Sequence, residues 1–276
     1  MTAPAVMMGP DGRSLTVIGL LRSPTLLRAA YPILGVSGLL GLWWLGGEVI
    51  AGNPDTAAFS DFAPGPAFAA LGEMLLDGSI LEAVVPSLLR VGLGLLWAIV
   101  IGLPLGILIG RVPAFRDATH IPFQFLRMVS PLSWMPIAVM TFNTWDAAIV
   151  FLITAAAIWP VTFATANGLR KVDPAWFKVA RNLGARGWHM LMHIIMPAIA
   201  QDVLTGVRLA LGVAWIVLVP AEYLGVTSGL GYAINDARDI LEYDRLAALV
   251  VTIGVLGFAL DSICLTLIRR YSWVRG

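Results

Sequence analysis

The amino-acid sequence predicts an all-α integral membrane protein with six transmembrane helices. Composition gives the first reason, because 58% of the 276 residues are hydrophobic, only 13% are charged, and mean hydropathy is +0.84. Soluble domains carry about a quarter charged residues. The second reason is a set of apolar stretches about as long as the roughly 20 residues that a helix needs to cross a bilayer. They lie at 31–50, 91–110, 121–142, 147–167, 203–220 and 246–268.

The second stretch carries the clearest packing signal. Residues 80–90 are also helix-prone and lead directly into it, so we expect this helix to begin before residue 91. Gly102, Gly106 and Gly110 recur every fourth residue and therefore share one face. Small residues let helices approach closely, which predicts a packing seam either within the subunit or against a second copy.

Four stretches each contain one charged residue, whereas those at 91–110 and 147–167 contain none. The charged residues are Glu48, Arg127, Arg208 and Asp261. A charge in hydrocarbon costs at least about 2.5 kcal/mol, so such side chains need partners or a wet cavity. One interpretation is a structural ion pair between Arg208 and Asp261 in the last two helices. The other is an uncompensated arginine that favours an anion, and Arg127 is the better candidate because its own and the following stretch contain no acid.

The distribution of charge between the connecting segments predicts the orientation. One side, with both termini, carries thirteen basic residues against Asp11, Asp117 and Asp173, whereas the loops of the other side are mainly acidic. Basic loops stay in the cytoplasm, so both termini are expected inside. Residues 1–30 form a basic N-terminal segment without a signal-peptide cleavage pattern, in which 15–27 is either an interfacial helix or a loose arm. Residues 31–276 form the transmembrane domain.

Several kinds of chemistry are not expected of this chain. Lys171 and Lys178 are its only lysines, and neither closes a phosphate-binding Gly-x-x-x-x-Gly-Lys-Ser/Thr loop. The single cysteine, Cys264, lies in an apolar run and forms no intrachain disulfide. The three histidines form no obvious metal cluster, and none can pair with a serine at membrane depth. We therefore predict no catalytic residue, no metal site and no bound cofactor.

The cytoplasmic segment at 168–200 is the longest basic connector and has clear helix boundaries. Asp173 followed by Pro174 is typical of a helix start, and Gly184 is expected to end that helix. Gly187 opens a second helix, and Pro197 marks the beginning of the fifth span. Two short helices at an angle to each other would form a protruding surface to which another protein can bind. A surface-lying connector without a partner is the alternative.

The spacing within 168–200 resembles the conserved loop of ABC-importer permeases. That loop reads Glu-Ala-Ala, three residues, Gly, nine residues, then Ile-x-Leu-Pro, and it forms the coupling helix that docks on the ATPase. Lys178, Val179, Ala180, Gly184, Ile194, Met196 and Pro197 stand at the matching positions. Lys178 replaces the glutamate and reverses its charge, whereas Met196 replaces the leucine with a nearly isosteric side chain.

The resemblance extends from about Pro86 to the last span and indicates the branch of permeases for nitrate, bicarbonate, sulfonate and taurine. It rests on Ser87-Leu-Leu-Arg, Leu204-Thr-Gly-Val-Arg, Ala221-Glu222-Tyr and Gly229-Leu-Gly-Tyr. The run Val129-Ser-Pro-Leu-Ser-Trp-Met-Pro-Ile-Ala is most similar to the nitrate and bicarbonate permeases. The resemblance implies a type I ABC importer-like permease with cytoplasmic coupling helices, in a bacterial inner membrane.

The resemblance also implies partners and roles. A second, identical permease subunit, two ATPase subunits that hold ATP and magnesium, a periplasmic binding protein and membrane lipid are expected, and no nucleic acid. The cargo is a small anion, nitrate or bicarbonate, with sulfonate or taurine as the alternative. The residues expected to couple to the ATPase are Lys178, Ala180, Gly184, Ala185, Arg186, Ile194 and Pro197. The residues expected along the substrate pathway are Arg127, Trp134, Pro136, Arg208 and Glu222.

The outer loop at 221–245 is too rich in glycine for a simple crossing turn. It resembles the re-entrant gate segment of importer permeases, followed by a helix with Asp236, Asp239 and Glu242 facing outward. These acids would dock the binding protein or would only be solvated. An ion-coupled secondary carrier is the alternative class of function, although the spans show no matched inverted halves.

Overall fold

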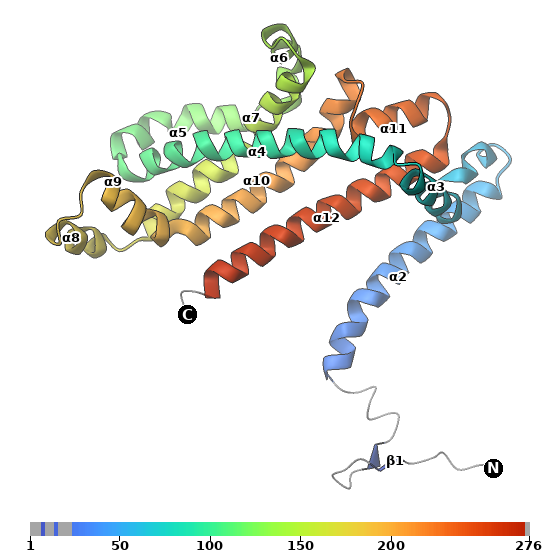
Figure 1. Cartoon of the computed structure of the whole chain (residues 1–276), viewed down its shortest axis with the longest axis horizontal. Coiled ribbons are helices and arrows are strands. Elements are labelled where there is room, and N and C mark those ends of the chain that lie inside the picture. The colour runs from blue at the N-terminus through green and yellow to red at the C-terminus, as the bar shows by residue number, and fades with distance from the viewer. Residues whose placement is uncertain (1–6, 9–13, 16–23, 274–276) are drawn as a thin grey trace. The chain divides into compact units, whose positions relative to one another are not determined.

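The computed structural model describes residues 7–8, 14–15 and 24–273, and it is almost entirely helical (Figure 1). The exception is a two-residue antiparallel pair, β1 at Met7–Met8 and β2 at Ser14–Leu15. The all-α prediction is confirmed. The expected interfacial helix at 15–27 falls largely outside the described residues. The chain divides into two compact units, one ending at Ala69 and the other beginning at Ala70.

The first unit contains helix α2 (Pro24–Ala51), the 3-10 helix η1 (Ala57–Phe62) and the start of helix α3 (Pro64–Leu76). Helix α2 covers the expected first span. The indole N–H of Trp43 donates a hydrogen bond to the carbonyl oxygen of Phe62 at 2.9 Å, and its ring lies 5.9 Å from that of Phe68. These contacts hold the turn after α2 against the helix.

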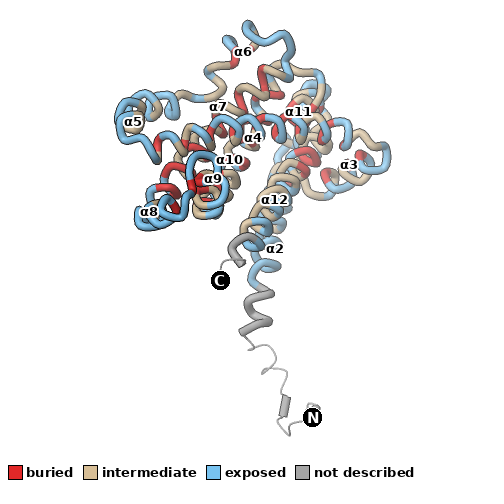
Figure 2. The backbone as a smooth tube through the Cα atoms, turned by 60° about the vertical axis from the view of Figure 1, so that its left-hand side comes forward, coloured by how far each residue is buried: buried red, intermediate tan, exposed pale blue. Residues whose placement is uncertain are grey.

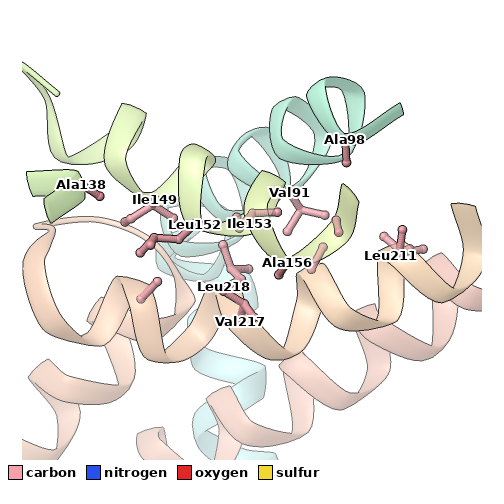
Figure 3. Close-up of a cluster of buried hydrophobic side chains, with 14 of the residues drawn as sticks. Val91, Ala98, Ala138, Ile149, Leu152, Ile153, Ala156, Leu211, Val217 and Leu218 are labelled. Atoms are coloured by element: carbon pink, nitrogen blue, oxygen red, sulfur yellow. The ribbon is translucent and has the colours of Figure 1, made fainter. Parts of the chain in front are cut away.

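Three long helices form the centre of the second unit. They are α4 (Ser79–Arg111), α7 (Trp145–Lys171) and α10 (Met196–Gly225). As expected, α4 begins well before residue 91. Buried residues gather where these helices meet (Figure 2). Ile149, Leu152 and Ile153 of α7 are fully buried between α4 and α10 (Figure 3). Helix α11 (Leu230–Asp239) and helix α12 (Tyr243–Trp273) complete this unit.

The glycines of α4 lie against α7 of the same chain. A Cβ atom added at Gly106 would lie 2.6 Å from the Cβ of Thr165, and one added at Gly110 would lie 2.9 Å from Leu169 Cδ2. Side chains essentially never approach so closely, so Gly106 requires glycine, whereas a side chain at position 110 would force Leu169 to shift. Of the two alternatives for this seam, the structure supports packing within the subunit.

The expected third span is not one continuous helix, which corrects the sequence analysis. Residues 121–142 are divided between helix α5 (Pro113–Met128), the 3-10 helix η2 (Pro131–Trp134) and helix α6 (Met135–Thr141). Pro131 disfavours the helical conformation at the residue before it, and Ser130 accordingly has ψ 127°. In the described part, the helices long and apolar enough to cross a membrane lie at 31–51, 79–111, 145–171, 187–225 and 243–270. A six-span count therefore stays a prediction.

Residues 168–200 form two helical segments, the first of which is helix α8 (Pro174–Asn182). The second, helix α9 (Gly187–Met190), continues through the π-helical turn η3 (Leu191–Ile195) into α10. As expected, Pro197 lies at the beginning of α10, in the first helical turn, where a proline costs no hydrogen bond. One helical segment thus runs from Gly187 to Gly225.

Candidate functional site

A groove of about 690 Å³ lies between the end of α5, helix α7 and helix α10. Its walls are mainly apolar, with Trp159 and Phe163 of α7 facing Leu209 and Val213 of α10. The polar and charged side chains that line it are Arg127, Asn167, Lys171, Asp202 and Thr205.

Two cationic side chains line the groove, and one of them, Arg127, forms no ion pair with a carboxylate among the described residues. Its guanidinium lies 5.4 Å from the centroid of the Phe163 ring, a cation–π contact. The other cation, Lys171, has its ammonium 2.6 Å from a carboxylate oxygen of Asp202, whose side chain packs on Gly168. The positive charge in the groove is therefore concentrated at Arg127.

The interruption of the third expected span opens onto the same groove. Val129 and Pro131, which flank the break between α5 and η2, both line it. The end of a helix leaves carbonyl groups without intrahelical partners, and such groups are tolerated at membrane depth where they line a cavity. The break thus brings polar backbone to the groove near Arg127.

Of the five side chains expected along a substrate pathway, only Arg127 lines this groove. Trp134 packs against the buried cluster of α7 and α10, and Pro136 is exposed near the start of α6. Arg208 lies toward α12, where it forms a bidentate ion pair with Asp261 at 2.6 and 2.7 Å. Glu222 is fully buried at the other end of α10.

Glu222 belongs to a buried polar network centred on Arg90 of α4, which is 4% exposed. Nη1 of Arg90 lies 2.5 Å from Oε1 of Glu222, and Nε donates to Asp146 Oδ1 at 2.7 Å. Ser87, one turn before Arg90 and also fully buried, donates to the Glu222 carboxylate at 2.8 Å. The network joins α4, α7 and α10.

The same network fixes the segment between α10 and α11. Arg90 donates to the carbonyl oxygen of Ser228 at 2.8 Å and to its hydroxyl at 2.9 Å. The backbone N–H of Gly231 donates to Glu222 Oε2 at 3.0 Å. Gly229 has φ +108°, and a Cβ there would lie 2.5 Å from the Glu222 carboxyl carbon. The glycines of this loop are therefore required by contact with buried charges.

The sequence analysis assigned no role to Arg90. The signal that points to it is the pair Ser87 and Arg90, which lie three residues apart and hence on one face of an otherwise apolar helix. Their acidic partner is more than 130 residues away in the chain. No local pattern could have indicated that pairing.

The segment at 168–200 has defined caps at both ends of α8. Asp173 Oδ1 accepts a hydrogen bond from the N–H of Ala175 at 2.8 Å. At the other end, the N–H of Ala185 donates to the carbonyl of Ala180 at 2.9 Å, and that of Gly184 to Arg181 at 3.0 Å, while Gly184 has φ +88°. This is a Schellman motif, in which the left-handed position favours glycine.

The surfaces of this segment divide into a buried and an exposed side. Ala180 and Ala185 are buried against the ends of α7 and α10. Ile194 is half-buried, and Pro197 is exposed. The other expected coupling residues, Lys178, Gly184 and Arg186, are exposed. Beside them stand large apolar side chains that are 60%, 83% and 70% exposed, at Trp176, Leu183 and Trp188 respectively. Exposed apolar groups next to cations are typical of a surface that a partner covers.

The sequence profile of the family described as binding-protein-dependent transport system inner membrane component matches residues 102–273. The chain belongs to this family. It is therefore a multi-pass membrane permease and a non-catalytic subunit of an ABC importer, which works with an ATPase and a substrate-binding protein. The assignment removes the ion-coupled carrier from consideration.

Relatives of this permease are named for different small anions. It is 35% identical over 188 residues to the bicarbonate transport system permease protein of Synechococcus elongatus, covering 67% of each chain. It is 35% identical over 201 residues to the putative aliphatic sulfonates transport permease protein of Bacillus subtilis, covering 72% of each. The nitrate import permease protein of Leptolyngbya laminosa is 30% identical over 250 residues, which cover 89% of this permease and 88% of that chain.

Proposed function

We propose that this permease carries a small oxyanion, nitrate or bicarbonate, from a periplasmic binding protein to the cytoplasm by alternating access. The observation that carries the proposal is Arg127, an uncompensated guanidinium in an otherwise mainly apolar groove. An apolar wall raises the electrostatic potential of such a charge, so the groove attracts an anion and repels a cation.

Aliphatic sulfonate or taurine is the second candidate cargo. The walls formed by Trp159, Phe163, Leu209 and Val213 would accommodate an alkyl chain while Arg127 holds the anionic head. Competition of nitrate, bicarbonate and taurine for uptake by the reconstituted importer separates the two candidates. Nitrate or bicarbonate should compete at lower concentration than taurine, and the reverse order would favour the sulfonate assignment.

The segment at 168–200 is proposed to be the docking surface for the ATPase subunits, which bind ATP and magnesium. Lys178, Gly184 and Arg186 would contact the ATPase directly, and Ala180 and Ala185 would fix α8 to the helix ends. Ile194 and Pro197 lie where α9 passes into α10, so movement of the docked helices would reach the groove. Such coupling requires that ATP binding favour one conformation by several kcal/mol.

Two copies of the permease with two ATPase subunits would form the importer, with both termini in the cytoplasm. The groove favours this arrangement because the Arg127 side of α5 is exposed in the single chain. A second copy would close the groove into a pathway. Trp134 and Pro136 then shape the break at one end of the wall, whereas the Arg208–Asp261 and Arg90–Glu222 pairs hold the helices around it.

The proposal is tested by uptake into proteoliposomes that contain the complete importer, with the binding protein added outside. Arg127→Gln should lower nitrate or bicarbonate uptake at least about tenfold, because it removes the charge that attracts the anion. Arg127→Lys should retain part of the uptake. Arg270→Gln is the matched control, since Arg270 is exposed, does not line the groove and lies outside the segment at 168–200. The rate of ATP hydrolysis reports whether each complex has assembled, and undiminished uptake by Arg127→Gln would contradict the proposal.

A further inference from the structure

A second, smaller cavity of about 260 Å³ adjoins the groove at the end where α5 begins. Helix α5 contacts the end of α4 there (Figure 1). The cavity shares Arg127, Phe163 and Asn167 with the groove, so the two border one another at these side chains. Its remaining lining residues are Ile109, Arg116, Thr119, His120, Phe123 and Gln124. We call it the α5 basic pocket.

The polar residues of the α5 basic pocket lie on one stripe of α5. Arg116, His120, Gln124 and Arg127 are separated by four, four and three residues, which places them on a single helix face. About eleven residues separate the first from the last, so the stripe is about 16 Å long. It leads from the beginning of α5 to the groove.

The chemistry of the α5 basic pocket matches an oxyanion. No carboxylate lines it, whereas guanidinium, imidazole and amide groups supply N–H donors. Arg116 donates through Nε to Asp117 at 2.9 Å, but Asp117 is outside the lining and most of the five guanidinium N–H groups remain. Thr119 donates its hydroxyl to the carbonyl of Phe115 at 2.7 Å, so it is not available as a donor.

We propose that the α5 basic pocket is a second binding site for the transported oxyanion, occupied after the anion leaves Arg127 and before it is released. This inference rests on the proposed function and extends it by naming Arg116 and His120 as the residues that receive the anion. The phosphate of an anionic lipid headgroup has the same chemistry. The free anion is favoured because the pocket borders the groove, and Arg127 and Asn167 line both.

Site-specific labelling of the complete importer in nanodiscs tests the site without requiring transport. Thr119→Cys, in a chain in which Cys264→Ser removes the natural thiol, places a reporter in the pocket wall. The rate of reaction with a maleimide is measured while sodium nitrate, sodium bicarbonate or sodium ethanesulfonate is titrated. At least one of these anions should slow labelling, since the bound anion shields the reporter.

Three further variants in the reporter chain decide which residues bind. Arg116→Gln and His120→Gln should each raise the half-protecting anion concentration, by about tenfold for Arg116→Gln, because a charge-assisted hydrogen bond is lost. Asp117→Asn is the matched control and should keep or strengthen protection, since it removes the negative charge beside Arg116 while retaining the acceptor oxygen. Protection that is absent, or unchanged in both Arg116→Gln and His120→Gln, would overturn the proposal.

A lipid arm separates the two sources of the oxyanion. Labelling is repeated in nanodiscs of pure phosphatidylcholine and of phosphatidylcholine with phosphatidylglycerol. Protection by the added anion in both compositions supports the site for free anions. Protection by phosphatidylglycerol alone, with no further effect of added anion, would assign the pocket to lipid and overturn the proposal. The labelling experiment does not measure uptake, so its outcome is independent of the uptake test of Arg127→Gln. Normal uptake by Arg127→Gln together with normal protection in the labelling experiment would refute the proposed function and leave this binding site supported.

Discussion

Arg90 of α4 and Glu222 of α10 form an ion pair in which the Glu222 side chain is fully buried and that of Arg90 is 5% exposed. Ser87, Ser228 and the N–H of Gly231 satisfy further hydrogen-bonding groups of the two side chains. A buried pair contributes little net stability compared with apolar residues, but removing one partner leaves an unpaired buried charge. Because loss of either partner is costly, the Arg90–Glu222 pair fixes the position of residues 226–229 relative to α4 and α10.

Glu222→Gln should lower the free energy of unfolding by about 3 kcal/mol, because the buried charge of Arg90 then keeps only the solvent-exposed carboxylate of Asp146 as a partner. Thermal unfolding of the purified permease in detergent measures the change. Arg238→Gln is the control, since its partner Asp239 is 56% exposed and such surface pairs contribute at most about 1 kcal/mol. Equal stability of the two variants would show that Glu222 is not the group that compensates Arg90.

Gly184→Ala and Gly184→Trp should separate backbone strain from docking. Both place a side chain at φ +88° and should cost about 1 kcal/mol of stability, although a Cβ there meets no atom within 4 Å. Only the tryptophan variant should lose stimulation of ATP hydrolysis by the binding protein, because its ring would occupy the docking surface. Gly78→Trp, also at positive φ and in open space but far from this segment in the chain, is the control for added bulk. Full stimulation in Gly184→Trp would place the ATPase elsewhere.

Asp202→Asn should lower the KM for the anion by about fivefold, equivalent to the roughly 1 kcal/mol of an exposed ion pair. The substitution releases the ammonium of Lys171, whose side chain is 70% exposed and which lines the groove with Arg127. Concentration-dependent uptake measures the effect. The double variant Lys171→Met, Asp202→Asn should return KM toward the wild-type value. An unchanged KM with lost ATP stimulation would instead assign the pair to the movement of α8.

The connection between α3 and α4 should contribute stability near neutral pH that is lost in acid. The backbone N–H of Ser79 donates to Asp77 at 2.8 Å and, with the Ser79 side chain, holds the pKa of the Asp77 carboxyl below its usual value. A carboxyl with a lowered pKa in the folded state stabilises above the unfolded pKa, about 3.9, and loses that contribution as pH falls through the folded pKa. The stability difference between wild type and Asp77→Asn should therefore be constant near neutral pH and shrink below about pH 4. A difference that grows in acid would contradict the sign.

Sequence reasoning succeeded where a signal is local and periodic. The apolar run at 147–167 lies within α7, and Asp173, Gly184 and Gly187 mark helix boundaries in the structure. It failed at 121–142, because mean hydropathy outweighed the local effect of Pro131 on the backbone.

The candidate site was predictable only in part. An arginine at membrane depth signals a functional position, and Arg127 was found in this way. The walls of its groove come from α7 and α10, which no single segment of sequence reveals. The partners of Arg90 are also far away in the chain. The sequence therefore showed that the loop at 221–245 is rich in glycine, but not that these glycines pack against the buried ion pair.

The π turn at Leu191–Ile195 determines the rotation, around the helix axis, of one end of the Gly187–Gly225 helix relative to the other. Such a turn accommodates one residue more than an α-helical turn, and one residue corresponds to about 100° around the axis. Thr205, Leu209 and Val213 line the groove. The inserted residue therefore sets the angle around the helix axis between these side chains and Trp188. Over about 58 Å, this one additional residue keeps the face that carries Trp188 in register with the face that lines the groove.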